Sequence, residues 1–223
     1  QAAFWESILA GESGTRRISL FDASDYHSQI AGEVADFDLT QYMQPKTRLR
    51  KLSRQTQLAL AAAQLGLADA GLDAGALAAE GSVPVYLGVS SSAIEVIEHG
   101  ISRMDTRGPS RVATHIVEAS SPQQAASLFG AEFGFPSTAH TIASACAAGL
   151  EAVGVATELI RSGRADVVIT GGADAPITRL AFACFDRSGL ASCRNADPEH
   201  AARPFDRDAD SGVISEGAGV LVI

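Results

Sequence analysis

The chain has 223 residues, of which 46% are hydrophobic, and a formal net charge of −9. This length suits one sizeable α/β domain or two small ones, and the acidic balance argues against a basic surface for nucleic acid. No apolar run reaches the ~18 residues of a membrane helix, and no secretion signal is seen. The three cysteines lack CxxC spacing, so we expect no disulfide framework, no zinc site and a reducing, cytoplasmic location.

Helix-forming segments recur along the chain and are bounded by cap residues and glycines. The clearest is 53–70, where Ser53 can cap the N-terminus and Gly71 can end the helix. Residues 15–45 and 107–111 are rich in turn formers and predict loops. In chain order, the predicted helices are a first helix closed by Gly11, then 53–70, 90–104, 121–134 and 147–162, and 176–189 is predicted to be a helix followed by a loop.

Short apolar runs alternate with these helices and predict buried strands. They lie at 83–89, 139–145, 165–172 and in the terminal segment 216–223. This alternation favours a mostly parallel sheet covered by helices on both faces. A final parallel strand is normally followed by a covering helix, and the first helix has no strand before it. We therefore expect 1–223 to be one piece of a longer protein, truncated at both ends.

Cys146 lies in "SACAAG" (144–149), where the predicted strand gives way to the predicted helix 147–162. The first turn of a helix offers unpaired N–H groups and the positive end of the helix dipole. That environment favours a thiolate, and the same N–H groups can hold an oxyanion. Gly149 permits close packing of the helix against the sheet. Two interpretations stay open on these grounds, a thiol nucleophile and a small buried apolar side chain.

A thiol nucleophile usually needs a basic or cationic partner. His140 precedes Cys146 by six residues on a presumed strand, which places it roughly 20 Å away. The remaining histidines fall on predicted helix surfaces or in polar loops, where solvated side chains are expected. The chain therefore supplies no evident partner, in keeping with a missing portion.

Several ordered segments resemble the β-ketoacyl-acyl-carrier-protein synthases, the condensing enzymes of the thiolase-like fold, particularly the elongating ketosynthase II type. The resemblance covers nearly the whole chain. Its motifs are "FWESILAGESG", "QLALAAAQLGLADAGL", "TIASACAAGLEAVGVATELIRSGRADVVITGGADA" and "ARPFDRDADSGVISEGAGVLVI". It implies an α/β thiolase-like fold with layers αβαβα, of which 1–223 is mainly the first half, with a mostly parallel mixed sheet.

The same resemblance implies the chemistry. Cys146 matches the nucleophile that accepts an acyl chain, which is then extended by decarboxylative Claisen condensation with malonyl-acyl carrier protein in fatty-acid synthesis. The enzyme binds no cofactor or metal of its own, because the substrate travels on the phosphopantetheine of acyl carrier protein. The partners implied are acyl carrier protein and a second copy in a homodimer, with neither nucleic acid nor membrane. Two histidines and a lysine of the family fall in the second half.

Three departures from the family pattern put subclass and substrate in doubt. Ser215 precedes Glu216 where glycine is common, and "DADSGV" and "RKLSRQTQ" differ from the usual forms. One alternative is a ketosynthase of a polyketide or specialised-lipid pathway. Another is a non-catalytic ketosynthase-like partner subunit, although such subunits generally carry another residue, often Gln, at the position of Cys146.

A basic cluster stands out on the acidic chain, in "KTRLRK" (46–51). It can be a solvated turn, or it can dock an acidic partner by local electrostatic attraction. Related synthases use basic residues near this place to bind their acidic carrier proteins. No aromatic residues interleave with the charges, so a nucleic-acid patch is disfavoured. The expected carrier-protein-binding residues are Lys46, Arg48, Arg50 and Lys51.

Ile97 is the expected substrate-binding residue, because related enzymes line the acyl pocket from the helix after "GVSSS". Its spacing from Ile94 and Ile101 also fits plain core packing, which we prefer on pattern alone. Cys184 and Cys193 are expected to be incidental thiols.

Two acidic residues and a glycine-rich segment complete the candidates. Glu216 and Asp206 are expected to make structural hydrogen bonds near the junction of the two halves, with a metal role as a minor alternative. "GGADA" (171–175) lacks the spacing of a nucleotide-binding loop, so no nucleotide site is predicted there.

Overall fold

The computed structural model describes residues 2–223; for Ala2 it describes the backbone alone. They form two compact units. The sheet unit comprises Asp36–Ala175 and Gly217–Ile223, and the loop unit comprises the residues up to Ala35 together with Pro176–Glu216. Each unit is assembled from segments that lie far apart in the sequence. The boundaries between the units are therefore not marked by a change in amino-acid composition along the chain.

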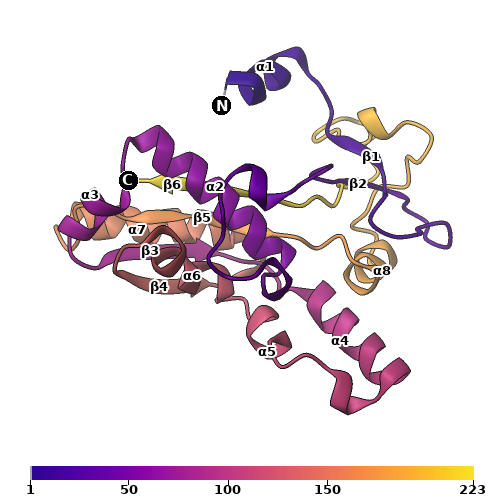
Figure 1. Cartoon of the computed structure of the whole chain (residues 1–223). Helices are drawn as coiled ribbons and strands as arrows, with labels where there is room; N and C mark the ends of the chain where they lie inside the picture. Colours follow the sequence, from indigo (N-terminus) through magenta and orange to yellow (C-terminus); the bar gives the residue numbers. More distant parts are fainter. Residues whose placement is uncertain (1) are drawn as a thin grey trace. The chain divides into compact units, whose positions relative to one another are not determined.

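Four strands form the sheet of the sheet unit, in the order β4-β3-β5-β6 (Figure 1). Strand β3 pairs in parallel with both β4 and β5, whereas β6 runs antiparallel to β5. The predicted mostly parallel sheet is therefore confirmed, with one antiparallel edge. The strands are β3 (Val83–Gly88), β4 (Ser137–Ile142), β5 (Ile169–Asp174) and β6 (Gly217–Val222).

Two of the strand predictions were wrong at their ends. Strand β4 ends at Ile142 instead of residue 145, because Ser144 and Ala145 leave the extended conformation and begin a turn. Strand β5 starts at Ile169 instead of residue 165, and it extends to Asp174 instead of residue 172 because its last residues pair with Ala218 and Gly217 of β6.

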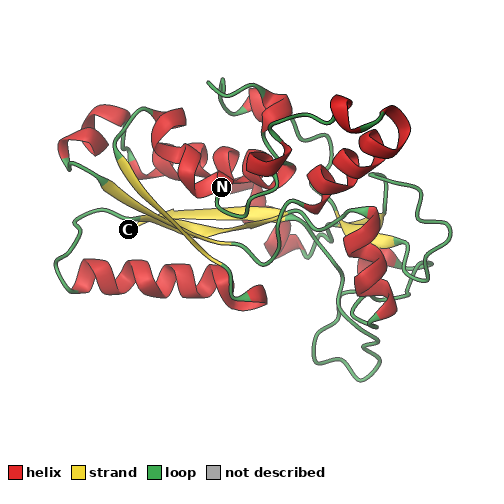
Figure 2. Ribbon diagram, turned by 90° about the horizontal axis from the view of Figure 1, so that it is seen from below, coloured by secondary structure: helices red, strands yellow, loops and turns green. Residues whose placement is uncertain are grey.

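Helices cover both faces of the sheet, as predicted. Helices α2 (Arg54–Ala70) and α6 (Gln124–Phe133) pack on one face, and α7 (Ala148–Arg161) packs on the other. In Figure 2, α7 is the long helix on the lower side of the yellow strands. The core between α2, α6 and the sheet contains fully buried Leu60, Leu87, Phe129 and Ile169, whose burial is the main stabilising term of this unit.

The caps predicted for 53–70 are confirmed. The Ser53 hydroxyl accepts the backbone N–H of Thr56, and Gly71 ends α2 with φ +67°. Helix α6 starts at Gln124 instead of residue 121, after a turn in which the Gln124 N–H donates to the Ser121 carbonyl. Helix α7 matches the predicted 147–162 to within one residue at each end.

Helix α4 (Ile94–Arg107) starts later than the predicted residue 90. The backbone N–H groups of Ser90 and Ser91 instead donate to the carboxylate of Asp174 at the end of β5. The remaining helical pieces of the sheet unit are short: α3 (Ala74–Ala79), α5 (Ile116–Ala119), and the 3₁₀ turns η1 (Leu39–Gln41), η2 (Leu49–Lys51), η3 (Pro109–Arg111) and η4 (Ala145–Ala147).

The loop unit has little regular structure. Its first helix ends as predicted at Gly11, which has φ +69°. A small core forms around Ala31, Ile177 and Phe182, with the rings of Phe21 and Tyr26 against Phe182. Its elements are α1 (Ala2–Ala10), β1 (Thr15–Arg17), β2 (Ile30–Gly32), α8 (Arg179–Arg187) and η5 (Pro198–His200), with β1 and β2 antiparallel.

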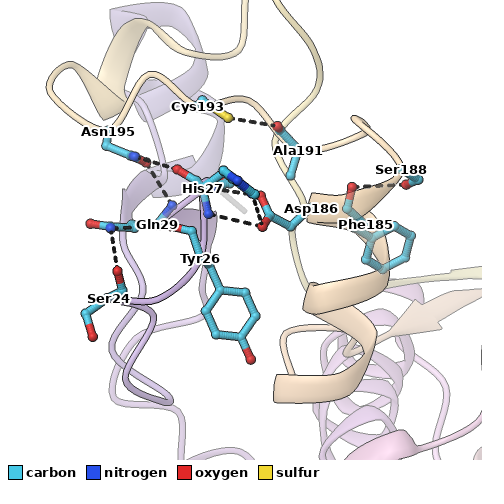
Figure 3. Close-up of polar contacts among 11 residues, drawn as sticks. Ser24, Tyr26, His27, Gln29, Phe185, Asp186, Ser188, Ala191, Cys193 and Asn195 are labelled. Carbon is cyan, nitrogen blue, oxygen red and sulfur yellow. Dashed lines mark hydrogen bonds and ion pairs between the residues drawn. The ribbon is translucent and has the colours of Figure 1, made fainter.

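The Asp186 carboxylate ties the loop at residues 27–28 to the end of α8 (Figure 3). It accepts the backbone N–H groups of His27 and Ser28 at 3.1 and 2.9 Å, and it lies 3.0 Å from the His27 ring. Burial alone would raise the pKa of Asp186, but these donors outweigh it and hold the pKa below its usual value. The carboxylate is therefore ionised wherever this unit is folded at neutral pH.

The expected structural hydrogen bonds of Glu216 and Asp206 are present. The Glu216 carboxylate accepts the Val34 N–H at 2.9 Å, and the Asp206 carboxylate accepts the Asp208 N–H at 2.7 Å. Among residues 2–223, no helix combines the length and apolar character needed to cross a membrane.

Candidate active site

Cys146 lies in the sheet unit, in the turn that joins β4 to α7. Cys146 is the middle residue of η4 and is exposed to solvent. The interpretation as a buried apolar side chain is therefore wrong for this chain. The preceding residue, Ala145, has φ +54°, a left-handed conformation that costs an alanine about 1–2 kcal/mol. This strained residue turns the chain sharply out of the strand, so that the cysteine stands at the corner.

Three glycines let the start of α7 lie directly on the ends of β3 and β5. A Cβ placed on Gly88 would lie 2.2–2.3 Å from backbone atoms of Ala148 and Gly149. A Cβ on Gly172 would lie 3.2 Å from the Cα of Gly149. The close packing predicted for Gly149 is confirmed. The roles of Gly88 and Gly172 were missed, since only the fold shows which strand ends meet the helix.

The backbone around Cys146 leaves donors available. The Ala148 N–H donates to the Ala145 carbonyl, whereas the Cys146 N–H has no acceptor within the described part of the chain. An unpaired N–H at the start of a helix can stabilise negative charge on a carbonyl oxygen attacked by the adjacent sulfur. The exposed thiol and this donor together suit nucleophilic attack on an acyl group.

Two hydroxyl groups near this turn have unused hydrogen-bonding capacity. The oxygens Thr141 Oγ1 and Ser144 Oγ are buried without a partner among residues 2–223. At the end of β5, on the other side of β3, the Asp174 carboxylate holds the loop after β3 through Ser90 and Ser91. Spacing alone could not find the contact of Asp174 with Ser90 and Ser91, because it depends on the pairing of β3 with β5.

The histidines do not supply a partner for the thiol. His140 stacks on Tyr86, with ring centroids 4.5 Å apart. His99 and His115 line a cavity that Cys146 does not line. In the loop unit, His27 and His200 lie 3.0 and 2.8 Å from Asp186 and Asp197. No described histidine has a recorded interaction with Cys146.

The other two thiols are also exposed. Cys193 approaches the Ala191 carbonyl at 3.9 Å (Figure 3). Partial burial, with the negative charges of Asp186 and Asp210, raises the pKa of Cys193. This thiol is therefore less readily ionised than an ordinary cysteine.

The four residues of the basic cluster differ in their surroundings. The Lys46 ammonium donates to the Ala131 carbonyl at 2.7 Å, and its backbone N–H donates to the Glu132 carboxylate. Lys46 is therefore engaged at the C-terminal end of α6. The exposed side chains of Arg48, Arg50 and Lys51 form no ion pair with a carboxylate among residues 2–223. Their docking to an acidic partner stays a prediction.

Ile97 is 38% exposed on α4, with Ile101 and Met104 also exposed. The preferred expectation of core packing is wrong for Ile97 and Ile101 within the described chain, whereas Ile94 is half-buried. Ile97 does not line the cavity formed by the neighbouring residues Val96, His99 and Gly100, and its role in binding an acyl chain stays a prediction.

Comparison with known proteins gives a consistent result. Residues 1–223 match the family model described as the beta-ketoacyl synthase, N-terminal domain. The chain is 38% identical over 229 residues to the tetracenomycin polyketide synthase ketoacyl synthase alpha subunit of Streptomyces glaucescens, covering 100% of the chain and 53% of that protein. It is 34% identical over 220 residues to 3-oxoacyl-[acyl-carrier-protein] synthase 2 of a Synechocystis strain, covering 99% of the chain and 52% of that protein.

Solved structures agree. The ishigamide ketosynthase/chain length factor matches with a TM-score of 0.88 and 30% identity, over 100% of the chain and 53% of the matched chain. A type II polyketide acyl-carrier protein in complex with its ketosynthase, AntDE:AntF, matches with a TM-score of 0.82 and 26% identity, over 99% and 53%. The chain thus spans about half the length of these relatives. With the thiolase-like arrangement of sheet and helices around an exposed cysteine corner, these matches show that the chain belongs to the beta-ketoacyl synthase family, as its N-terminal domain.

Proposed function

We propose that the protein is a condensing acyltransferase in which Cys146 carries the growing acyl chain. The observation that carries this proposal is the exposed Cys146 at the β4–α7 corner, whose own backbone N–H has no acceptor among residues 2–223. Family membership supports the reaction class, because a ketosynthase needs a nucleophile at the start of a helix that can also stabilise an oxyanion.

In the first half-reaction, the Cys146 thiolate attacks the thioester carbonyl of an acyl chain on the phosphopantetheine arm. The Cys146 N–H donates to the oxygen of the tetrahedral intermediate, the carrier thiolate leaves, and the acyl group stays on Cys146. Malonyl carrier protein then loses CO₂, and the resulting carbanion attacks the Cys146 thioester. The Cys146 thiolate is expelled, and the carrier holds a 3-ketoacyl chain that is two carbons longer.

We assign the proton transfers and the decarboxylation to residues outside this chain, since no described histidine contacts Cys146. Acyl carrier protein is the proposed partner, and Arg48, Arg50 and Lys51 are its proposed contacts. One solved relative is a ketosynthase in complex with its carrier protein, which supports this choice. Charge reversal at Arg50 and Lys51 should weaken carrier binding, measured by calorimetry at low salt. Unchanged affinity would remove the docking proposal.

Fatty-acid elongation is the first candidate pathway, and a polyketide pathway is the second. Relatives from both pathways match, and the polyketide subunit has the higher identity of the two compared above. The products distinguish the candidates. With an acyl primer on carrier protein, malonyl carrier protein and no reductase, a fatty-acid synthase should stop at a single 3-ketoacyl extension, whereas a polyketide synthase should add several units without reduction.

Covalent loading tests the nucleophile directly. The full-length protein should take up radiolabelled acyl groups from acyl carrier protein, and Cys146→Ala should abolish that uptake. Cys184→Ala is the matched control, because it also removes an exposed thiol, and its loading should match the unchanged protein. Loading that survives Cys146→Ala would end the proposal. Cys146 unmodified by iodoacetamide, with other thiols labelled, would favour a non-catalytic partner subunit.

We also propose a homodimer and a cytoplasmic location. The exposed apolar stripe of Ile97, Ile101 and Met104 on α4 supports an interface with a second copy, since such stripes are normally covered. Light scattering on the full-length protein would measure its mass in solution, and a monomer at micromolar concentration would contradict the homodimer.

A further inference from the structure

The loop that follows β3 is held on both sides, at the ends of β4 and β5. On one side, the Val89 N–H donates at 2.9 Å to the carbonyl of Ile142, the last residue of β4. On the other side, the Ser90 N–H donates to the Asp174 carboxylate at 3.0 Å, and the Ser91 N–H donates to it at 3.1 Å. The side chain of Asp174 thus extends the connection between β3 and β5 beyond the point where their backbone pairing ends.

Because of this attachment, α4 lacks the first turn that its sequence favours. The pattern of 90–104 predicts a helix from residue 90, yet α4 starts at Ile94. Ala93, at the N-cap position, has the non-helical angles φ −71° and ψ 81° and offers no side-chain cap. Capping groups stabilise helix ends, so α4 itself gains nothing from this start. The extended loop is therefore favoured by its contacts with Asp174 and the strand ends.

The end of β3, from which this loop continues, lies in contact with the first turn of α7. A Cβ placed on Gly88, the last residue of β3, would lie 2.2–2.3 Å from backbone atoms of Ala148 and Gly149. Cys146 precedes this contact by two residues, in η4. A shift of the end of β3 therefore displaces the first turn of α7 and, with it, the sulfur and the backbone N–H of Cys146.

The carboxylate of Asp174 is dedicated to this loop. It forms no ion pair with a basic side chain among residues 2–223. Its partners are the backbone N–H groups of Ser90 and Ser91 and, at 3.4 Å, the Ser91 hydroxyl. Hydrogen bonds from N–H groups to an ionised carboxylate are stronger than those between neutral groups. Asp174 can therefore fix the loop where regular strand pairing has ended.

We propose that Asp174 is a positioning residue for acyl transfer at Cys146, and that it acts by holding the loop after β3 beside the first turn of α7. The inference rests on the condensation proposed above, because it assigns Asp174 a role in that reaction. Asp174 need not touch the thiol or the substrate, since it fixes the backbone that sets the position of the thiol and its N–H. A displacement of about 1 Å in reacting groups can lower a rate roughly a hundredfold.

The test is single-turnover acyl loading of the full-length protein over a range of acyl carrier protein concentrations. Asp174→Ala should lower the maximal loading rate by about ten- to a hundredfold, because the reacting groups move. The half-saturating carrier concentration should stay unchanged, because the docking surface is untouched. Asp174→Asn keeps one acceptor oxygen, and its rate should lie between those of Asp174→Ala and the unchanged protein.

Asp73→Ala is the matched control. The Asp73 carboxylate also accepts a backbone N–H in the sheet unit, that of Ala76 at 2.8 Å, but it does so at the start of α3. This variant loses a hydrogen bond of the same kind and should load at the rate of the unchanged protein. A role of Asp174 in general stability alone would slow both variants alike.

Three results of the loading experiment would overturn the proposal. Asp174→Ala could load as fast as the unchanged protein, Asp174→Asn could load no faster than Asp174→Ala, or Asp73→Ala could be slowed as much as Asp174→Ala. A change in the half-saturating carrier concentration that accounts for the whole loss would also overturn it, because the loss would then lie in binding.

Hydrogen exchange at the Ser90 and Ser91 amides separates failure of this proposal from failure of the condensation. Exchange should be faster in Asp174→Ala than in the unchanged protein, and equal exchange would overturn the attachment of the loop by Asp174. Absence of acyl uptake in the unchanged protein, together with faster exchange in the variant, would overturn the condensation and leave the attachment in place.

Discussion

The close contact between Gly88 and the start of α7 makes a sharp prediction. In Gly88→Ala, the new Cβ would meet the Ala148 carbonyl carbon at 2.2 Å and the Gly149 nitrogen at 2.3 Å. Both are backbone atoms, so no side-chain rotation can relieve the clash. The first turn of α7 must move away from β3 by about 1 Å to restore an ordinary contact of about 3.4 Å.

That displacement has two measurable consequences. Overpacking of this kind destabilises a protein by about 1–3 kcal/mol. Because η4 leads directly into α7, Cys146 and its N–H should move with the helix, and a displacement of about 1 Å in reacting groups can cost roughly a hundredfold in rate. Urea unfolding would measure the first effect, and the rate of acyl loading on Cys146 would measure the second.

Gly154→Ala is the matched control for this prediction. Gly154 is also on α7, and a Cβ there would meet nothing within 4 Å. Alanine in a helix interior is favoured over glycine by about 0.5–1 kcal/mol, so this variant should be slightly more stable and load normally. The reasoning would be refuted if Gly88→Ala kept the stability and the loading rate of the unchanged protein.

Three further predictions concern the strain, the core and the loop unit. Ala145→Gly should raise the free energy of unfolding by about 0.5–1 kcal/mol, because glycine adopts φ +54° without strain, and a loss of stability in urea would contradict this. Phe129→Ala should lower it by about 3–5 kcal/mol, since the ring is fully buried beneath α2, and a loss below about 1 kcal/mol would contradict its place in the core. The pKa of Asp186 is lowered in the folded protein, so its contribution to stability is present above the ordinary aspartate pKa of 3.8 and is lost as the pH falls through the folded pKa. Asp186→Asn should therefore lower the melting temperature at pH 7, and the difference should shrink on acidification below about pH 4; a constant difference would argue against an ionised Asp186.

The sequence predicted those parts of the structure that depend on local signals. Ser53 and Gly71 marked the ends of α2 because capping and positive φ are properties of single residues. The position of Cys146 at a strand-to-helix corner followed from the change in residue types around it. The late start of α4 could not be predicted, because it depends on Asp174, which lies 84 residues beyond Ser90.

The antiparallel strand β6 has a consequence for how the chain folds during synthesis. It covers the edge of β5 and packs against α2, where Gly66 approaches the Val220 carbonyl. Until the ribosome has made residues 217–222, the N–H and C=O groups along one edge of β5 have no partner strand. Exposed edges of this kind pair readily with other chains and promote aggregation. The nascent protein therefore passes through a vulnerable stage, and a chaperone that shields β5 should raise the yield of folded protein.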